Sequence, residues 1–119
     1  KILERFHSMA SELGLMVDYY PGTKDNMYLE ITPPGISKGW ALQELARHLH
    51  LDMEEVVAIG DNLNDLTMIQ KAGLGVVMGN GHSQLIKVAG KVTLSNDQDG
   101  VAAAINSIVL PATASRQAV

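Results

Sequence analysis

Polar side chains follow the short apolar runs in the second half of this sequence. Residues 56–59 are followed by Gly60-Asp61-Asn62-Leu63-Asn64-Asp65, and residues 74–78 are followed by Gly79-Asn80-Gly81-His82. A third run, residues 92–94, is followed by Ser95-Asn96-Asp97. In an open parallel sheet, ligands bind beyond the carboxyl ends of the strands, so these turns are the first candidates for a site.

The acidic residues of the first turn have the spacing of an oxygen-rich metal site. Asp61 and Asp65 are four residues apart, and both carboxylates can face one crevice if a helix begins at Asn64 or Asp65. Magnesium prefers one or two protein carboxylates together with waters and phosphate oxygens. The simpler alternative is that Asn64 or Asp65 only caps the helix expected over residues 66–72. Two Asp and two Asn within five residues favour the functional interpretation.

Lys38 is a second unusual residue. It follows Ser37, a suitable N-cap, so it falls in the first turn of the next predicted helix. A cation there opposes the helix dipole at a cost of about 0.3–1 kcal/mol. A phosphate or a carboxylate beside it would reverse that cost. The alternative is a solvated surface lysine.

The elements that would position these residues can be predicted from periodicity. Residues 1–13 have the apolar spacing of a helix, with Gly14 as its C-cap, and residues 15–20 and 27–32 are expected to form a hairpin. A helix should run from Ser37 to about His50, with a buried face formed by Trp40, Leu42, Leu45, Ala46 and Leu49. The β-branched runs at residues 56–59, 74–78 and 92–94 predict an α/β fold with a parallel sheet, although their spacing is short for ordinary crossovers.

Composition limits the classes of partner. The chain has 119 residues, 46% of them hydrophobic and 18% charged, which is typical of a folded, soluble protein. A net charge of −4 with scattered Lys and Arg argues against nucleic acid as a partner. No apolar run approaches the roughly 20 residues needed to span a bilayer, so we expect no membrane insertion. The absence of Cys excludes a disulfide framework and suits a reducing, cytoplasmic location.

Four ordered motifs give the sequence a resemblance to a known family. They are Ser37-Lys38-Gly39, then residues 60–68, then Val77-Met78-Gly79-Asn80, and finally Ser95-Asn96 with Asp99-Gly100-Val101. Their order and spacing over residues 27–109 resemble those of Cof-type phosphatases of the haloacid dehalogenase-like superfamily. The resemblance implies a Rossmann-like core and hydrolysis of phosphate monoesters through an aspartyl-phosphate.

The same resemblance implies roles for individual residues. Lys38 would hold the phosphoryl group and the nucleophile, and Asp61 would bind Mg²⁺ directly. Asp65 would support the metal site through water or through Lys38. Asn64, and with it Asn80, would contact the phosphate.

The resemblance is incomplete at its most important point, because the family's nucleophile motif, two aspartates one residue apart followed by Gly-Thr, is absent. Asp97-Gln98-Asp99-Gly100 has similar spacing but continues with Val101 and is expected to begin a helix. We therefore expect the chain to be a carboxyl-terminal portion that is inactive alone. Residues 1–34 would end a cap domain, residues 35–110 would form half of the hydrolase core, and residues 111–119 would form a flexible tail.

The expected substrate is a sugar phosphate or a similar small phosphorylated metabolite. The sheet strand that is missing would leave an exposed edge, which favours self-association. Two other interpretations remain open at this stage. One is a phosphomutase or the phosphorylation domain of a cation-pumping ATPase, and the other is a catalytically silent binding or assembly module.

Overall fold

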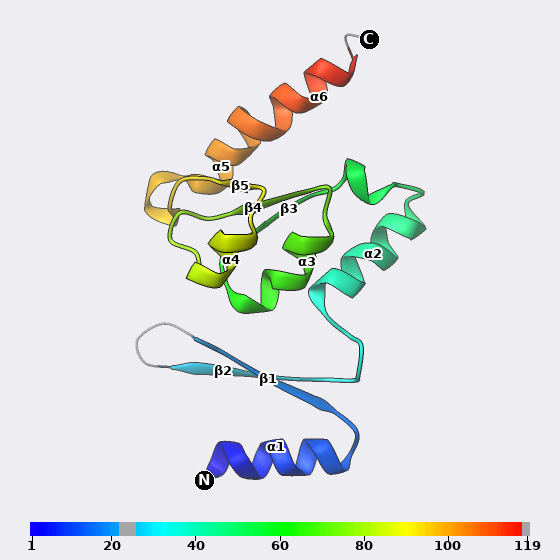
Figure 1. The fold of residues 1–119 in the computed structure, drawn as a ribbon, viewed down its shortest axis with the longest axis vertical. Coiled ribbons are helices and arrows are strands. Elements are labelled where there is room, and N and C mark those ends of the chain that lie inside the picture. The colour runs from blue at the N-terminus through cyan, green and yellow to red at the C-terminus, as the bar shows by residue number, and fades with distance from the viewer. Residues whose placement is uncertain (22–25, 118–119) are drawn as a thin grey trace.

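The structure, a computed structural model, describes residues 1–21 and 26–117. Figure 1 shows an amino-terminal helix and hairpin on one side of a small α/β unit, with a long helical segment at the far end. The helices and strands, in chain order, are α1 (Ile2–Glu12), β1 (Met16–Pro21), β2 (Met27–Thr32), α2 (Lys38–His48), β3 (Val57–Gly60), α3 (Leu66–Lys71), β4 (Leu74–Val77), α4 (Ser83–Val88), β5 (Lys91–Val92), α5 (Gly100–Ala104) and α6 (Leu110–Gln117).

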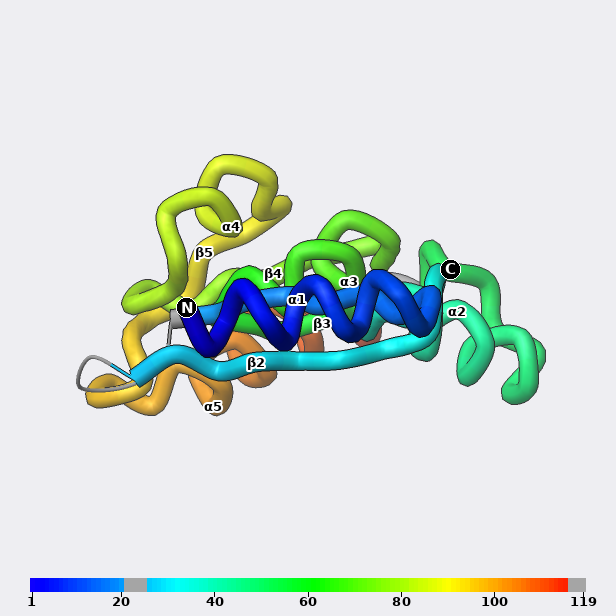
Figure 2. Tube along the Cα trace, turned by 90° about the horizontal axis from the view of Figure 1, so that it is seen from below, coloured from blue at the N-terminus to red at the C-terminus, as the bar shows by residue number. Residues whose placement is uncertain are grey.

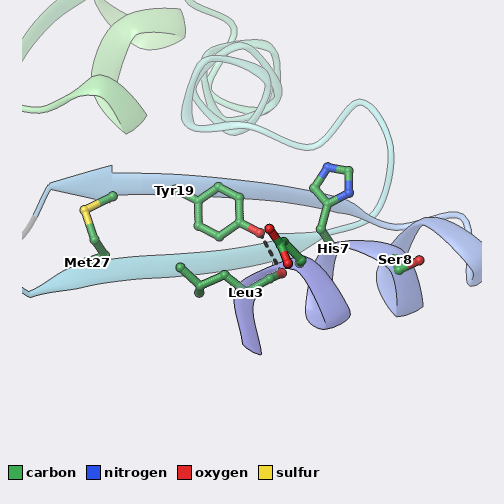
Figure 3. A pocket seen from close by; sticks show the side chains of 6 residues that line it. Leu3, His7, Ser8, Tyr19 and Met27 are labelled. Carbon is green, nitrogen blue, oxygen red and sulfur yellow. Dashed lines mark hydrogen bonds between the residues drawn. The ribbon is translucent and has the colours of Figure 1, made fainter. Parts of the chain in front are cut away.

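Helix α1 lies along the hairpin formed by β1 and β2, as Figures 1 and 2 both show. The strands pair antiparallel from Met16 opposite Thr32 to Pro21 opposite Met27, and the predicted turn itself lies outside the described residues. Gly14 adopts a positive φ of 70°, which lets the chain leave the helix and turn back into β1. The Tyr19 hydroxyl donates a hydrogen bond to the Leu3 carbonyl oxygen at 3.1 Å (Figure 3) and so ties the two elements together.

The hairpin has two chemically different faces because side chains alternate along a strand. Tyr19 and Met27 lie on the face toward α1, where they line a hollow together with Leu3. Asp18, Tyr20, Glu30 and Thr32 lie on the opposite face, which is turned toward the α/β unit. We refer to these four residues as the polar face of the hairpin.

The three remaining strands form the predicted parallel sheet in the order β3-β4-β5. Val76 and Val77 of the central strand are fully buried, as expected for β-branched residues covered on both sides. Ala58, Ile69, Val77 and Leu85 form the core cluster, so α3 and α4 pack on the sheet. Each of these helices has only six residues, which explains why the predicted strands are so closely spaced.

The buried face predicted for α2 is partly wrong. The N-cap at Ser37 is confirmed, but the helix ends at His48, and only Ala46 and Gly39 are buried. Trp40, Leu45 and Leu49 are each more than 40% exposed, and Leu42 is half-buried. The reason is that α2 packs against the short helix α3, which covers only a narrow stripe of a longer helix.

The end of the chain also differs from the prediction. The sequence predicted a flexible tail without apolar periodicity from Pro111, whereas a helical run from Gly100 passes through a π-helical turn at Ile105–Val109 into α6. Pro111 follows the π-helical turn, where the regular hydrogen-bond ladder of the α-helix is already interrupted, and Ala112 and Ala114 favour helix. Among the described residues, no helix is both long enough and apolar enough to cross a bilayer.

We predict that Leu85→Ala lowers the free energy of unfolding by about 2–5 kcal/mol, because it removes a fully buried side chain from the core cluster. Leu45→Ala is the matched control, since that leucine is 54% exposed and should change stability by less than about 0.5 kcal/mol. Urea titration of both variants measures the difference. Equal losses would contradict this assignment of the core.

Candidate active site

The turn that follows β3 is held by the side chain of Asp65. Its Oδ2 accepts hydrogen bonds from the backbone N–H groups of Asp61 at 2.9 Å and Asn62 at 3.2 Å. The Asn62 side chain in turn accepts from the Leu63 N–H at 2.8 Å. Gly60 is required beside this carboxylate, because a Cβ on it would lie 2.6 Å from the Asp65 Cβ. The turn therefore has one conformation, fixed by its own polar side chains.

Lys38 reaches the same carboxylate from a separate element. Its Nζ lies 2.5 Å from Asp65 Oδ1, across 27 residues of sequence. Gly39 makes this approach possible, since a Cβ on it would lie 2.6 Å from the Thr67 backbone, while its N–H donates to Thr67 Oγ1 at 3.0 Å. The amino-terminal ends of α2 and α3 are thus in direct contact, and Lys38 is placed against Asp65 by that contact.

The ion pair has one buried member and one accessible member. The Asp65 side chain is 6% exposed and the Lys38 side chain is 44% exposed. Burial raises the pKa of Asp65, but the hydrogen bond from Lys38 and those from two backbone N–H groups outweigh it and leave the pKa below its ordinary value. Asp65 is therefore a carboxylate at neutral pH. Its charge compensates the cation in the first turn of α2 that the sequence marked as unusual.

Asp61 differs from Asp65 in the contacts of its carboxylate group. Its backbone is held at both ends, because its N–H donates to Asp65 and its carbonyl accepts from the His82 N–H at 2.8 Å. Within the described residues, the structure gives its carboxylate no hydrogen bond or ion pair, and the residue is exposed. A fixed backbone with an uncommitted carboxylate suits a residue that binds something from outside the chain.

The two predicted asparagines lie in different surroundings. Asn64 lines the same cavity as Lys38. Asn80 Oδ1 accepts from the Asn96 N–H at 2.8 Å and so joins the turns that follow β4 and β5, away from that cavity. His82 Nδ1 accepts from the Gln84 N–H at 3.2 Å and caps α4. The structure thus brings Lys38, Asp65 and Asn64 together, places Asp61 in the same turn, and leaves Asn80 bridging two loops.

The cavity beside Lys38 has a volume of about 290 Å³ and lies between the hairpin and the start of α2 and α3. Its walls include Thr67, Asn64 and the polar face of the hairpin. A larger hollow of about 480 Å³ lies on the other face of the hairpin (Figure 3), but it contains none of the predicted site residues and is mostly apolar. The smaller cavity is therefore the candidate site.

Sequence reasoning missed two kinds of contributor to this site. Thr67 was predicted only as part of a motif. In the structure its hydroxyl oxygen accepts a hydrogen bond from the Gly39 N–H. The polar face of the hairpin was not assigned to the site at all. The alternation of Asp18 and Tyr20 on one strand with Glu30 and Thr32 on the other was the available signal, but only the packed structure shows which face is turned toward Lys38.

The carboxylates present fit magnesium as part of a site. Among the described residues, no group of three or more His, Asp or Glu side chains is arranged to hold a metal ion. Magnesium does not need such a group, because it retains waters and binds through one or two carboxylates together with phosphate oxygens. Asp61 offers one uncommitted carboxylate, and Asp65 lies in the same turn with its oxygens engaged by Lys38 and the backbone.

Replacing Lys38 tests whether the ion pair stabilises the fold. Lys38→Met keeps the length of the side chain but leaves the buried carboxylate of Asp65 short of a donor, so we expect the free energy of unfolding to fall by about 1–3 kcal/mol. Lys71→Met is the control, because Lys71 contacts Gln43 on an exposed surface, and its loss should change stability by less than about 0.5 kcal/mol. Similar effects of the two substitutions in urea titrations would argue against a buried pair.

The pKa of Asp65 predicts a dependence of stability on pH. A carboxyl group whose pKa is lower in the folded protein stabilises the fold above its ordinary value of about 3.9, and the stabilisation disappears as pH falls through the folded value. Asp65→Asn resembles the protonated acid, so the variant should be clearly less stable than the native chain at pH 7. That difference should shrink below about pH 4.

Urea midpoints of the native chain, Asp65→Asn and Asp97→Asn at pH 7 and pH 3 measure this effect. Asp97 is exposed in a short 3₁₀ helix, and its replacement should have a small effect at both pH values. A gap between Asp65→Asn and the native chain that does not depend on pH would contradict the linkage.

Comparison with known proteins agrees with the geometry. The model of the haloacid dehalogenase-like hydrolase family matches residues 5–105. The chain is 51% identical over 77 residues to the chloroplastic endoribonuclease YBEY of Arabidopsis thaliana, covering 65% of this chain and 13% of that protein. It is 45% identical over 82 residues to the 5-amino-6-(5-phospho-D-ribitylamino)uracil phosphatase YcsE of Bacillus subtilis, covering 69% of this chain and 33% of YcsE.

Solved structures with the same arrangement include a haloacid dehalogenase-like hydrolase from Bacteroides thetaiotaomicron, with a TM-score of 0.74 and 40% identity over 89% of this chain and 38% of that one. The subclass IIB sugar phosphatase BT4131 has a TM-score of 0.71 and 28% identity, covering 87% of this chain and 38% of its own. The chain therefore spans well under half the length of these relatives. Together, the family match and the shared parallel sheet show that this chain belongs to the haloacid dehalogenase-like hydrolases.

Proposed function

We propose that this chain supplies the metal-binding and phosphate-binding half of the active site of a magnesium-dependent phosphomonoester hydrolase. The observation that supports this most strongly is the pairing of Lys38 with Asp65 beside Asp61, at the carboxyl end of β3 and at the mouth of a cavity. Several relatives of the chain are phosphatases by name, including YcsE and the sugar phosphatase BT4131. The proposal extends that activity to the protein that contains this chain.

In this proposal each residue has a distinct task. The Lys38 ammonium attracts the phosphoryl group and balances its charge, while Asp65 positions that ammonium and does not touch the substrate. Asn64 donates to a phosphate oxygen from the same cavity. Asn80 contacts the phosphate through its amide nitrogen in this proposal, because its side-chain oxygen already accepts a hydrogen bond from the Asn96 N–H.

Asp61 is the proposed direct ligand of Mg²⁺, and Asp65 supports the metal site through water or through Lys38. Bound magnesium would neutralise negative charge on the phosphoryl oxygens as it builds up during transfer. The backbone of Asp61 is already fixed by Asp65 and His82, so its carboxylate needs little reorganisation to bind a cation.

The nucleophile in this proposal is an aspartate outside residues 1–119. The aspartates most similar in spacing, Asp97 and Asp99, do not follow a strand directly. Asp97 lies in a short 3₁₀ helix, and Asp99 has a positive φ of 54° at the start of α5. We therefore propose that the chain alone does not hydrolyse phosphate esters. We also propose that residues 1–34 end the cap, residues 35–110 form the carboxyl-terminal half of the hydrolase core, and residues 111–119 form the tail.

Sugar phosphates or similar small metabolites are the proposed substrates, and the cytoplasm is the proposed location.

Strand β3 lies at an edge of the three-stranded sheet, and Val57 on it is 36% exposed. An unpaired edge is able to accept another strand, so self-association of the isolated chain through β3 is part of the proposal. We propose no nucleic-acid or membrane partner.

A chimera tests the proposed activity. Residues 1–119 would replace the matching segment of YcsE, and phosphate release from p-nitrophenyl phosphate with Mg²⁺ would be measured. We expect activity in the chimera and none in the isolated chain. Lys38→Ala and Asp61→Ala should each reduce kcat by at least about 100-fold, because each removes a charge that acts on the phosphoryl group.

Lys71→Ala is the control, because Lys71 is exposed and is not among the residues that line the cavity, and it should leave kcat close to that of the unchanged chimera. Circular dichroism confirms that each variant is folded. A folded chimera that is inert toward a broad panel of phosphorylated metabolites would overturn the proposal.

A further inference from the structure

The polar face of the hairpin forms one wall of the candidate site. Asp18 and Glu30 are directly opposite each other in the register of β1 and β2, so their side chains leave the same face of the hairpin next to each other. Tyr20 and Thr32 extend that face on either side. All four line the cavity of about 290 Å³ whose other wall contains Lys38 and Asn64.

The two walls carry opposite charge. Among the described residues, Lys38 is the only lysine or arginine that lines the cavity. Its positive charge is already paired with the Asp65 carboxylate. Neither Asp18 nor Glu30 forms an ion pair within residues 1–21 and 26–117. The hairpin wall therefore presents two uncompensated carboxylates to whatever enters the cavity.

Tyr20 adds a neutral hydroxyl to this wall. Burial, together with the negative charges of Asp18 and Glu30, raises the pKa of Tyr20 to about 12. The phenol also forms a hydrogen bond with Glu30. The Tyr20 phenol thus remains protonated at neutral pH, and the wall contributes two carboxylates together with the hydroxyl groups of Tyr20 and Thr32.

These charges fix the direction in which a phosphate ester would enter. A phosphate group is repelled by the Asp18 and Glu30 carboxylates and attracted by the Lys38 ammonium, so it lies at the Lys38 wall and the leaving group lies at the hairpin wall. The cavity is at the small end of the range for ligand pockets, roughly 300–1,000 Å³. A compact leaving group of few atoms fits this space.

We propose that Asp18 and Glu30 are specificity residues that favour leaving groups carrying ammonium or hydroxyl donors and reject leaving groups carrying a second anionic group. This inference rests on the proposed phosphatase function and adds the substrate class to it. Carboxylates accept hydrogen bonds from hydroxyls and ammonium groups, and an anion next to them is disfavoured in a partly enclosed site.

The YcsE chimera tests the inference with three sugar 6-phosphates of similar size. Glucosamine 6-phosphate carries a cation, sorbitol 6-phosphate is neutral at the leaving group, and 6-phosphogluconate carries a carboxylate. We expect kcat/KM to fall in that order, with at least about a tenfold difference between the first and the last. In the double variant Asp18→Asn/Glu30→Gln this difference should narrow by about tenfold, chiefly through a higher kcat/KM for 6-phosphogluconate.

Glu12→Gln is the matched control, because it removes one negative charge from the exposed surface of α1 and should leave the order unchanged. Asp18 and Glu30 are exposed, so the double variant should remain folded, and the single variants Asp18→Asn and Glu30→Gln give the same measurement if it does not. The inference is overturned if the folded variants hydrolyse the three esters with the preference of the unchanged chimera. If none of the three esters releases phosphate, the proposed function itself fails. An active chimera whose preference does not change in the variants overturns only the inference, so the two failures can be told apart.

Discussion

The contact between Lys38 and the buried carboxylate of Asp65 is the interaction on which the rest of this structure depends. A carboxylate side chain that is 6% exposed must be paired and hydrogen-bonded, or it would be protonated or would destabilise the fold. Asp65 meets this requirement with one ammonium and two backbone N–H donors. The same contacts bring the start of α2, the end of β3 and the start of α3 to one point.

Close backbone approach is what makes this contact geometrically possible. Gly39 lies against the backbone of Thr67, and Gly60 lies against the side chain of Asp65. A Cβ on either glycine would lie only 2.6 Å from the nearest of these atoms. A larger residue at either position would separate the helices or displace the carboxylate. The glycines in these motifs therefore serve packing, and the charged residues beside them depend on that packing for their positions.

The hairpin connects the α/β unit with the amino-terminal helix through two unlike surfaces. Its face toward α1 is mostly apolar and is held by the hydrogen bond from Tyr19 to Leu3. Its polar face is turned toward Lys38 and carries acidic groups. A single pair of strands thus supports one packing contact and one wall of a polar cavity, because alternate side chains of a strand point in opposite directions.

The sequence by itself determined most of the local structure and the identity of the central residues. Periodicity predicted α1, the hairpin and the parallel strands, and the cation in the first turn of α2 indicated a nearby negative charge. It did not determine which side of α2 is buried or that α6 continues the helix beyond Pro111, since both depend on neighbours and on helix continuity. The pairing of Lys38 with Asp65 and the orientation of the Asp18 and Glu30 face were decided only by tertiary structure. The physical reason is that local pattern fixes the faces of an element, whereas the packing of distant elements fixes which face meets which charge.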